Sequence, residues 1–517
     1  MGVSKPRKVA IVGGGLTGVA SFWAMQDSCL DVHLFEASPA LGGHMKTLSL
    51  ESNGNQIQVD MELPTFNPKA CPNLVSLLRY LSIPTTAVPF SFGVLDDSWV
   101  FRWHISILKS VILDPRILCK LETYRLILDA ITLRCLGADV LTRKSSDRED
   151  THESTESYLS KRGYSDSFRD RYLTPLLSTL WRTNAGRLLP KLPIRALAQS
   201  LNDHQFLSTS EKIPKWRRID HGVSYLIETL AKGFPGEGLH LQTKVNEIIR
   251  RSKSQYDLVT SSGSYSHFDH IILTVDGHEI IRLLGSALTI KEKEIIEGLS
   301  VTRNIAVLHS DYPSITAGAT PGYNYVMASR DYRRPDLVPP KSCLRYDVNV
   351  LQDIPISRFG DVYITLNTLS PPHPSLVHGV WEFTEPEPSA KSLYAQSQLT
   401  SIQKTRGLSY GYCWTGRGLL EDAVTSGLRL AAEDLGASVP FNVASHPQPL
   451  DSTVILSKHP GLRVSLIRTT LEAIRALVLV LEIVMLLLGR FHTPGSKVRA
   501  RLSLSRALRT GATNPQA

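Results

Sequence analysis

Glycines in two turns, one near each end of the chain, are the residues whose type and spacing best suit chemistry. The first turn lies in VAIVGGGLTGVA at residues 9–20, and the second lies in GYCWTGRGLLEDAVTSGLRLAAE at residues 411–433. Each is followed by a pattern typical of a helix. A glycine turn that opens a helix binds anions, because free backbone N–H groups and the positive end of the helix dipole both point there. We therefore expect each turn to face a negatively charged ligand.

The first turn has the glycine spacing of a dinucleotide-binding site. The glycines that follow the pattern G-x-G-x-x-G are Gly13, Gly15 and Gly18. The first permits the tight turn, the second lets a pyrophosphate approach the backbone, and the third lets helix and strand pack closely. A short apolar strand precedes the turn at residues 7–12, and a second strand at residues 32–37 ends in Glu36, whose carboxylate can hold both hydroxyls of a ribose. This βαβ unit predicts dinucleotide binding but does not separate NAD from FAD.

The stretch EASPALGGHMKT, at residues 36–47, separates the two cofactors. It places the pair Gly42 and Gly43 directly after the acid, followed by His44 and then Thr47. With the first turn, this stretch resembles the signature of the flavin-containing amine oxidase superfamily, which includes the phytoene desaturases. Most members have Arg where this chain has His44. In having His here, the chain resembles a branch of predicted NAD/FAD-binding proteins that often occur beside lipid-modifying enzymes. The resemblance implies FAD bound across a two-domain fold.

The resemblance also implies which residues contact FAD. They come from the first turn, the glycine pair, a strand in TKVNEII that gives a main-chain contact to the adenine, and the helix after the second turn. Together they are Gly13, Gly15, Gly18, Glu36, Gly42, Gly43, His44, Val245, Glu421, Asp422 and Ala423. The acids Glu421 and Asp422 are interpreted first as partners of their own helix dipole. In this arrangement the two turns meet over one cofactor, the second near the flavin end.

Three places depart from the usual pattern of that branch. Glu62 and Leu63 replace a Gly-Phe pair, Leu420 replaces a His, and His221 stands where a first Gly is common. In relatives these positions line or border the flavin. We therefore expect them to change the substrate or the reaction rather than the cofactor.

Few residues can be assigned to catalysis, because flavin performs the difficult step while the protein supplies position, dryness and electrostatics. The weak candidates are Trp181, His309, Tyr412 and Trp414. Core packing is the alternative for Trp181, and a buried strand position is the alternative for His309. Tyr412 and Trp414 would form an aromatic cage near the isoalloxazine ring. The sequence has no G-x-S-x-G motif for a nucleophilic triad, and its six cysteines contain no C-x-x-C pair, so we expect no metal site.

The order of the predicted elements indicates interleaved domains in a chain of 517 residues. The expected fold class is α/β: a Rossmann-type FAD-binding domain interleaved with a substrate domain of mixed sheet plus a helical insert, and a C-terminal hydrophobic helix. The expected segments are 1–70, FAD-binding βαβ unit and flavin loop; 71–215, mostly helical substrate or cap segment; 216–280, strands returning to the FAD domain; 281–400, substrate-domain sheet; 401–440, C-terminal FAD-binding segment; and 441–517, apolar helix and basic tail.

The C-terminal stretch at residues 464–488 is apolar except for one narrow stripe. That stripe consists of Arg468, Glu472, Arg475 and Glu482. As a single helix it would be long enough to cross a bilayer, and no acid but several basic residues follow Glu482. We expect a membrane-embedded or interfacial helix with the basic residues on the cytosolic side, the alternatives being a dimerisation or core helix and a solvated tail. Scattered cysteines and the absence of Asn-x-Ser/Thr favour a cytosol-facing, membrane-associated location, the alternative being a soluble cytoplasmic one.

The function that we expect is an FAD-dependent oxidoreductase that dehydrogenates or desaturates a hydrophobic small molecule, such as a lipid, polyketide or terpenoid of secondary metabolism. One alternative is an FAD-dependent monooxygenase or epoxidase of a biosynthetic pathway. A separate NAD(P)H domain is not indicated, because no other G-x-G-x-x-G follows a strand. The other alternative is a non-catalytic membrane-associated flavoprotein, which the departures near the flavin would explain. No nucleic-acid partner is expected.

Overall fold

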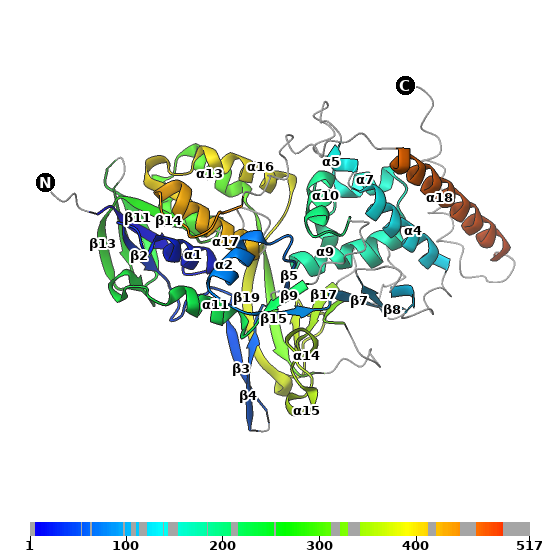
Figure 1. The fold of residues 1–517 in the computed structure, drawn as a ribbon, viewed down its shortest axis with the longest axis horizontal. Helices are drawn as coiled ribbons and strands as arrows, with labels where there is room; N and C mark the ends of the chain where they lie inside the picture. Colours follow the sequence, from blue (N-terminus) through cyan, green and yellow to red (C-terminus); the bar gives the residue numbers. More distant parts are fainter. Residues whose placement is uncertain are drawn as a thin grey trace.

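Two halves of α/β structure lie side by side, and one long helix projects from the end remote from the first strand (Figure 1). The computed structural model describes residues 6–52, 54–62, 65–96, 99–104, 110–112, 121–137, 139–142, 153–183, 185–207, 216–252, 255–311, 321–328, 342–411, 420–444 and 462–489. We call the half that contains the parallel sheet the parallel half, and the half that contains the largest sheet the mixed half. Their overall arrangement is the α/β fold class expected from the sequence.

The parallel half is built on a sheet whose strands come from across the whole chain. In the described residues its order is β10-β2-β1-β14-β20, and all neighbours run parallel. The strands are β1 (Lys8–Val12), β2 (Asp31–Phe35), β10 (Leu239–His240), β14 (His270–Leu273) and β20 (Leu408–Tyr410). Strands such as KVAIV and HIIL are apolar at nearly every position because both faces of a parallel sheet are covered.

Alternate residues of β1 enter different cores. Val9 and Ile11 pack with the helices, whereas Ala10 and Val12 pack with a small antiparallel sheet and the helices beside it. The covering helices on the first face include α1 (Leu16–Met25), α2 (Pro72–Tyr80), α11 (Gly222–Ala231) and α17 (Leu420–Arg429). The second face meets β11 (Val245–Arg250), β12 (Tyr256–Thr260), β13 (Gly263–Phe268), α12 (Gly277–Leu284), α13 (Ile290–Gly298) and α16 (Ala390–Gln398).

Opposite ends of the chain meet where α1 crosses α17. Gly427 permits this approach, because a Cβ atom added there would lie 2.5 Å from the carbonyl oxygen of Thr17. The hydroxyl of Ser21 donates to the carbonyl of Gly427 at 3.1 Å. The helix that follows the second glycine turn is therefore fixed against the helix that follows the first.

The mixed half contains the largest sheet in the described part of the chain, in the order β19-β15-β18-β17-β16-β7-β8. Only β16 and β7 pair in parallel among these neighbours. The strands are β7 (Ser91–Asp96), β8 (Trp99–His104), β15 (Val301–His309), β16 (Tyr323–Met327), β17 (Ser342–Asp347), β18 (Tyr363–Leu366) and β19 (Val377–Pro386). The predicted helical insert therefore also supplies two strands to this sheet.

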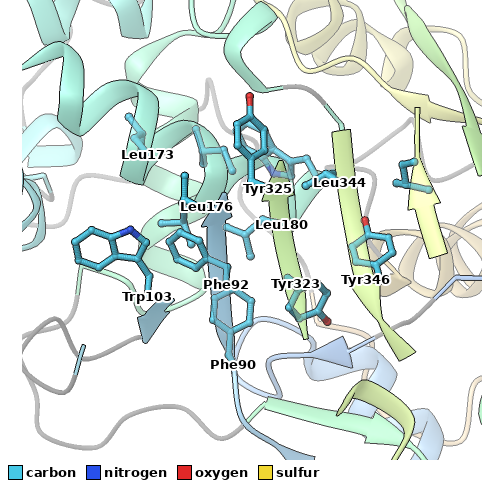
Figure 2. Packing of buried hydrophobic residues seen from close by; sticks show 14 of the residues in the cluster. Phe90, Phe92, Trp103, Leu173, Leu176, Leu180, Tyr323, Tyr325, Leu344 and Tyr346 are labelled. Atoms are coloured by element: carbon cyan, nitrogen blue, oxygen red, sulfur yellow. The ribbon is translucent and has the colours of Figure 1, made fainter. Parts of the chain in front are cut away.

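Helices cover one face of that sheet and exclude water from it. They include α4 (Leu121–Leu136), α5 (Asp139–Thr142), α7 (Thr155–Lys161), α8 (Asp166–Phe168), α9 (Thr174–Trp181) and α10 (Ile194–Asp203). Figure 2 shows Leu176 and Leu180 of α9 packed over Phe92 of β7 and Tyr325 of β16. Rings and aliphatic side chains thus fill the space between helix and sheet.

Short strands and a hairpin connect the halves. A small antiparallel sheet has the order β5-β9-β6, and β3 pairs with β4. These elements are β3 (Thr47–Ser52), β4 (Asn55–Asp60), β5 (Thr65–Phe66), β6 (Thr85–Val88) and β9 (Trp216–Ile219), and the helices α14 (Val348–Gln352) and α15 (Ile356–Phe359) lie nearby.

The long helix α18 (Leu462–Gly489) packs against α4 at the outer side of the mixed half (Figure 1). Of the helices that the structure describes, none combines the length and the apolar character needed to cross a membrane. The segment boundaries expected from the sequence remain predictions.

Candidate active site

The first glycine turn joins β1 to α1 and has the shape of an anion cradle. Gly13 has a positive φ of 110°, and a Cβ atom at Gly18 would lie 2.0 Å from the carbonyl oxygen of Gly13. Side chains at these two positions would therefore break the turn. A Cβ atom at Gly15 would meet none of the described atoms within 4 Å, so open space lies in front of the N-terminus of α1. This space suits the close approach of a pyrophosphate to the backbone.

Glu36 and the glycine pair are bonded directly to that turn. The carboxylate of Glu36 accepts from the N–H of Gly14 at 2.6 Å and from the N–H of Ser38 at 2.7 Å. The N–H of Gly42 donates to the carbonyl of Gly14 at 2.8 Å. Each carboxylate oxygen retains a second lone pair that can accept a ribose hydroxyl. The residues present therefore fit a dinucleotide at this place.

Val245 is the residue expected from the sequence to contact the adenine. It begins β11 and is buried, and its register partner is Thr260. Two residues before it, the N–H of Thr243 donates to the carbonyl of Glu36 at 2.8 Å. The main chain leading into β11 is thus hydrogen-bonded to the residue predicted to hold the ribose.

At the other end of the chain, the side chain of Glu421 has a different partner from the one expected. Its carboxylate accepts from the N–H groups of Asn73 and Leu74 at 2.9 and 2.8 Å, so it caps the first turn of α2 while lying in the first turn of its own helix. Ala423 is buried in the core beside α1, and Asp422 is partly exposed. A role for the N-terminus of α17 toward the flavin stays a prediction.

Next to the glycine pair, four ionisable residues form what we call the charged cluster: His44, Glu62, Arg182 and Glu385. His44 Nε2 lies 3.3 Å from Glu62 Oε1, and the guanidinium of Arg182 pairs with Glu62 Oε2 and lies 3.3 Å from Glu385 Oε1. Both glutamates are almost fully buried. Two of the four, His44 and Glu62, are departures from the family pattern, and the structure shows that these departures contact each other.

The charges of this cluster do not balance without a proton. Two buried carboxylates face one guanidinium. Burial raises the pKa of Glu385 to about 8; the charge of Arg182 opposes this shift, and the charge of Glu62 adds to it. The attraction of Glu385 and Glu62 outweighs burial and raises the pKa of Arg182. The raised pKa favours the protonated form of Glu385, which would leave Glu62 paired with Arg182.

Sequence reasoning missed Arg182 and Glu385. Glu385 lies on the same inner face of β19 as Phe383, which is two residues before it. An acid at an otherwise apolar position of that strand is the signal that could have revealed it. Arg182 lies beyond the end of α9 in the left-handed conformation, with φ 52°, and its local sequence gives no comparable signal.

A cavity of about 310 Å³ opens between the β3–β4 hairpin, β9 and α14. Its polar lining includes Thr47, Asp60, Arg218, His221 and Gln352. Asp60 accepts from the hydroxyl of Thr47 at 2.9 Å and from the N–H of Val223 at 3.2 Å, while burial raises its pKa against these bonds. His221, which differs from the family pattern, thus lines a cavity large enough for part of a small ligand.

The weak catalytic candidates separate into two groups. Trp181 ends α9 and is buried in the core of the mixed half. His309 ends β15, where its Nε2 lies 2.8 Å from the hydroxyl of Thr365, and burial lowers its pKa to about 4. Both positions fit the packing alternatives given for them. Tyr412 and Trp414 lie outside the described residues.

Comparison with known proteins adds relatives of two kinds. A match of 38% identity over 58 residues, 11% of this chain and 9% of the other, links it to the carotenoid phi-ring synthase of Chlorobaculum tepidum. This short match covers a small part of that protein. Among solved structures, a fatty acid isomerase from P. acnes is 14% identical with a TM-score of 0.55, covering 84% of this chain and 99% of its own.

Two further solved structures share the fold. Cyclohexylamine oxidase from Brevibacterium oxydans IH-35A is 15% identical with a TM-score of 0.55, covering 83% of this chain and 98% of its own. A putative protoporphyrinogen oxidase from Exiguobacterium sp. 255-15 is 16% identical with a TM-score of 0.53, covering 84% and 99%. Residues 16–317 match the family described as flavin-containing amine oxidoreductase. Since that match spans more than half of the chain, the protein belongs to the flavin-containing amine oxidoreductases and is an FAD-dependent oxidoreductase.

Proposed function

We propose that this protein dehydrogenates or desaturates a hydrophobic small molecule, such as a lipid, polyketide or terpenoid of secondary metabolism. When bound, FAD supplies the acceptor for a hydride. The residues of the chain bind and orient the molecule and exclude water from it.

The cofactor would be held by the groups described above. The N–H groups at the start of α1, open at Gly15, would receive the pyrophosphate, and Glu36 would receive the ribose. His44 follows the glycine pair and would border the flavin end. The charged cluster would then lie between the cofactor and the sheet of the mixed half.

The observation that supports a hydrophobic substrate is a row of buried aromatic rings. We call it the aromatic row, and it consists of Trp216, Phe90, Tyr323 and Tyr346. Successive ring centroids lie 4.4, 5.8 and 5.6 Å apart. The row ends at the charged cluster, since the charges of Arg182, Glu385 and Glu62 all act on the hydroxyl of Tyr346. Three of these rings are labelled in Figure 2.

The row suits flat or aliphatic molecules, and the pairing of the buried carboxylates with Arg182 disfavours ammonium ions. Aromatic faces give an apolar molecule a large contact area. The buried carboxylates are paired with Arg182, so an amine would have to displace that guanidinium to gain an ionic partner. The names of two similar proteins, a carotenoid phi-ring synthase and a fatty acid isomerase, support the same choice.

Anaerobic reduction of the flavin tests this function directly. The purified holoenzyme would be mixed with fractionated lipid and metabolite extracts, and the visible absorbance of the oxidised flavin would be followed. We expect apolar fractions to bleach it, whereas putrescine and cyclohexylamine, the matched amine controls, leave it oxidised. Bleaching by the amines alone would contradict the proposal.

The same experiment separates the alternatives. Incorporation of labelled oxygen into the product during aerobic turnover would show that the reaction is a monooxygenation and not a dehydrogenation. A flavin that no fraction reduces, although dithionite reduces it, would support the non-catalytic flavoprotein.

A further inference from the structure

The helix α18 turns Arg475 toward the protein and an apolar side away from it. The aliphatic residues on the outer side are 41% to 62% exposed, and they are Leu466, Ile467, Ile474, Leu477, Val480, Leu481 and Val484. Toward the protein, Leu471 is buried, and Arg475 is mostly covered. An ordinary surface helix instead turns its apolar side toward the protein.

These outer residues form one continuous face, which we call the outward face. At about 100° per residue they fall within an arc of about 140°. Arg468, Glu472 and Arg475 all fall outside this arc. Thr470 and Ala473 complete the outward face and are uncharged. An apolar surface of this continuity marks a place where the protein meets an apolar partner.

Arg475 fixes the helix in this orientation. Its guanidinium donates to Asp129 Oδ1 at 2.8 Å and to the carbonyl of Gly163 at 2.9 Å, and it stands 4.7 Å above the ring of Tyr164. Asp129 is fully buried, and its other oxygen accepts from the N–H and hydroxyl of Ser165. Rotating α18 to hide its apolar side would leave the Asp129 carboxylate without its cation, which is strongly unfavourable in a buried site.

We propose that the outward face of α18 lies on the surface of an anionic lipid bilayer, with the helix parallel to the membrane. The sequence after Glu482 supplies the complementary charge, since it contains no acid and has Arg490, Lys497, Arg499, Arg501, Arg506 and Arg509. Basic residues beside an interfacial apolar helix are attracted to phosphatidylserine and similar headgroups. In a dimer formed through this face, the same residues would repel their copies, so charge favours lipid over a second chain.

Vesicle flotation of the full-length holoenzyme tests this inference independently of its substrate. The probes are vesicles of phosphatidylcholine alone and of phosphatidylcholine mixed with phosphatidylserine. We expect binding to the mixed vesicles that weakens as salt is raised, because the electrostatic part is screened. The outward-face variant Leu477→Glu/Leu481→Glu should lose binding by about tenfold or more, because two leucines that would enter the bilayer are replaced by acids.

A matched control carries the same two charges elsewhere. Ile290 and Val380 are exposed aliphatic residues distant from α18 in the sequence, so Ile290→Glu/Val380→Glu has the same net charge and should bind the mixed vesicles far better than the outward-face variant. Retained flavin absorbance and circular dichroism would show that both variants fold. Equal binding by the two variants, or no binding by the wild type, would overturn the proposal. A wild-type dimer that the outward-face variant converts to a monomer, without lipid binding, would assign the face to a second copy instead.

Discussion

At the scale of single residues, Arg182 has a demanding position. It is the cation that two buried carboxylates share, and both carboxylates lie where the mixed half approaches the glycine pair. Breaking a buried ion pair from one side costs more than the pair contributes, because the remaining charge stays buried without compensation. The stability of the active site should therefore depend more on Arg182 than on the surface ion pairs.

Replacing Arg182 with Met should lower the free energy of unfolding by about 3–5 kcal/mol, since the buried carboxylate of Glu62 then loses its guanidinium partner. Urea unfolding would measure this change. The control is Arg303→Met, which removes an exposed arginine paired with Glu382 and should cost less than about 1 kcal/mol. If both variants cost the same, Arg182 does not neutralise a buried cluster.

The proton on Glu385 predicts a pH dependence of stability. Burial raises its pKa to about 8 in the folded protein, whereas the pKa of a glutamate in the unfolded chain is about 4.3. Between those values the folded state binds more protons than the unfolded state, so the free energy of unfolding falls as pH rises from about 4.3 to 8. Thermal melts at several pH values should show this decline in the wild type relative to Glu385→Gln. Parallel profiles for the two proteins would refute it.

At the scale of elements, the crossing of α1 and α17 links the two glycine turns. The crossing depends on Gly427, because an added Cβ would meet the backbone of Thr17 and the side chain of Ala20. We expect Gly427→Val to lower the free energy of unfolding by about 1–3 kcal/mol and to reduce FAD retention, since the helices must separate. Urea unfolding and flavin content after gel filtration would measure both effects.

A valine at Gly236 provides the comparison for that variant. An added Cβ there meets none of the described atoms within 4 Å, so the same substitution meets no comparable steric conflict. Gly236→Val should keep its flavin. A Gly427→Val protein with the flavin content of this control would mean that the crossing does not support the cofactor site.

The elements also show which features could be predicted from the sequence. The first turn, the strand that precedes Glu36 and the glycine pair were predictable because each is set by residues adjacent along the chain. The cap that Glu421 gives to α2 was not, because its partners lie more than 300 residues away and their N–H groups leave no sequence pattern. The stripe containing Arg475 was visible, but the side of α18 that faces the protein is decided by the buried Asp129.

At the scale of the whole molecule, the two halves are built from interleaved segments of the chain. The parallel sheet takes strands from residues 8–12, 270–273 and 408–410, and the strands of the mixed half lie between them in the sequence. Neither half is a continuous segment, so neither can close its sheet while the other remains open. This interleaving was foreseeable from the alternation of patterns, whereas the charged cluster between the halves depends on side chains that only the folded chain brings together.

This interleaving predicts one cooperative unfolding transition that FAD shifts as a whole. Trp103, Trp181 and Trp216 are buried in the mixed half and Trp23 packs in the parallel half, so tryptophan fluorescence reports mainly on the mixed half, whereas flavin release reports on the cofactor site. Ligand at 100 times its dissociation constant adds about 2.7 kcal/mol, which for a chain of 517 residues raises Tm by about 2–3 °C. Both signals should move together by this amount, with riboflavin as the control ligand that lacks the pyrophosphate. Two separate transitions, with only the flavin signal shifted, would mean that the halves unfold independently despite their interleaved strands.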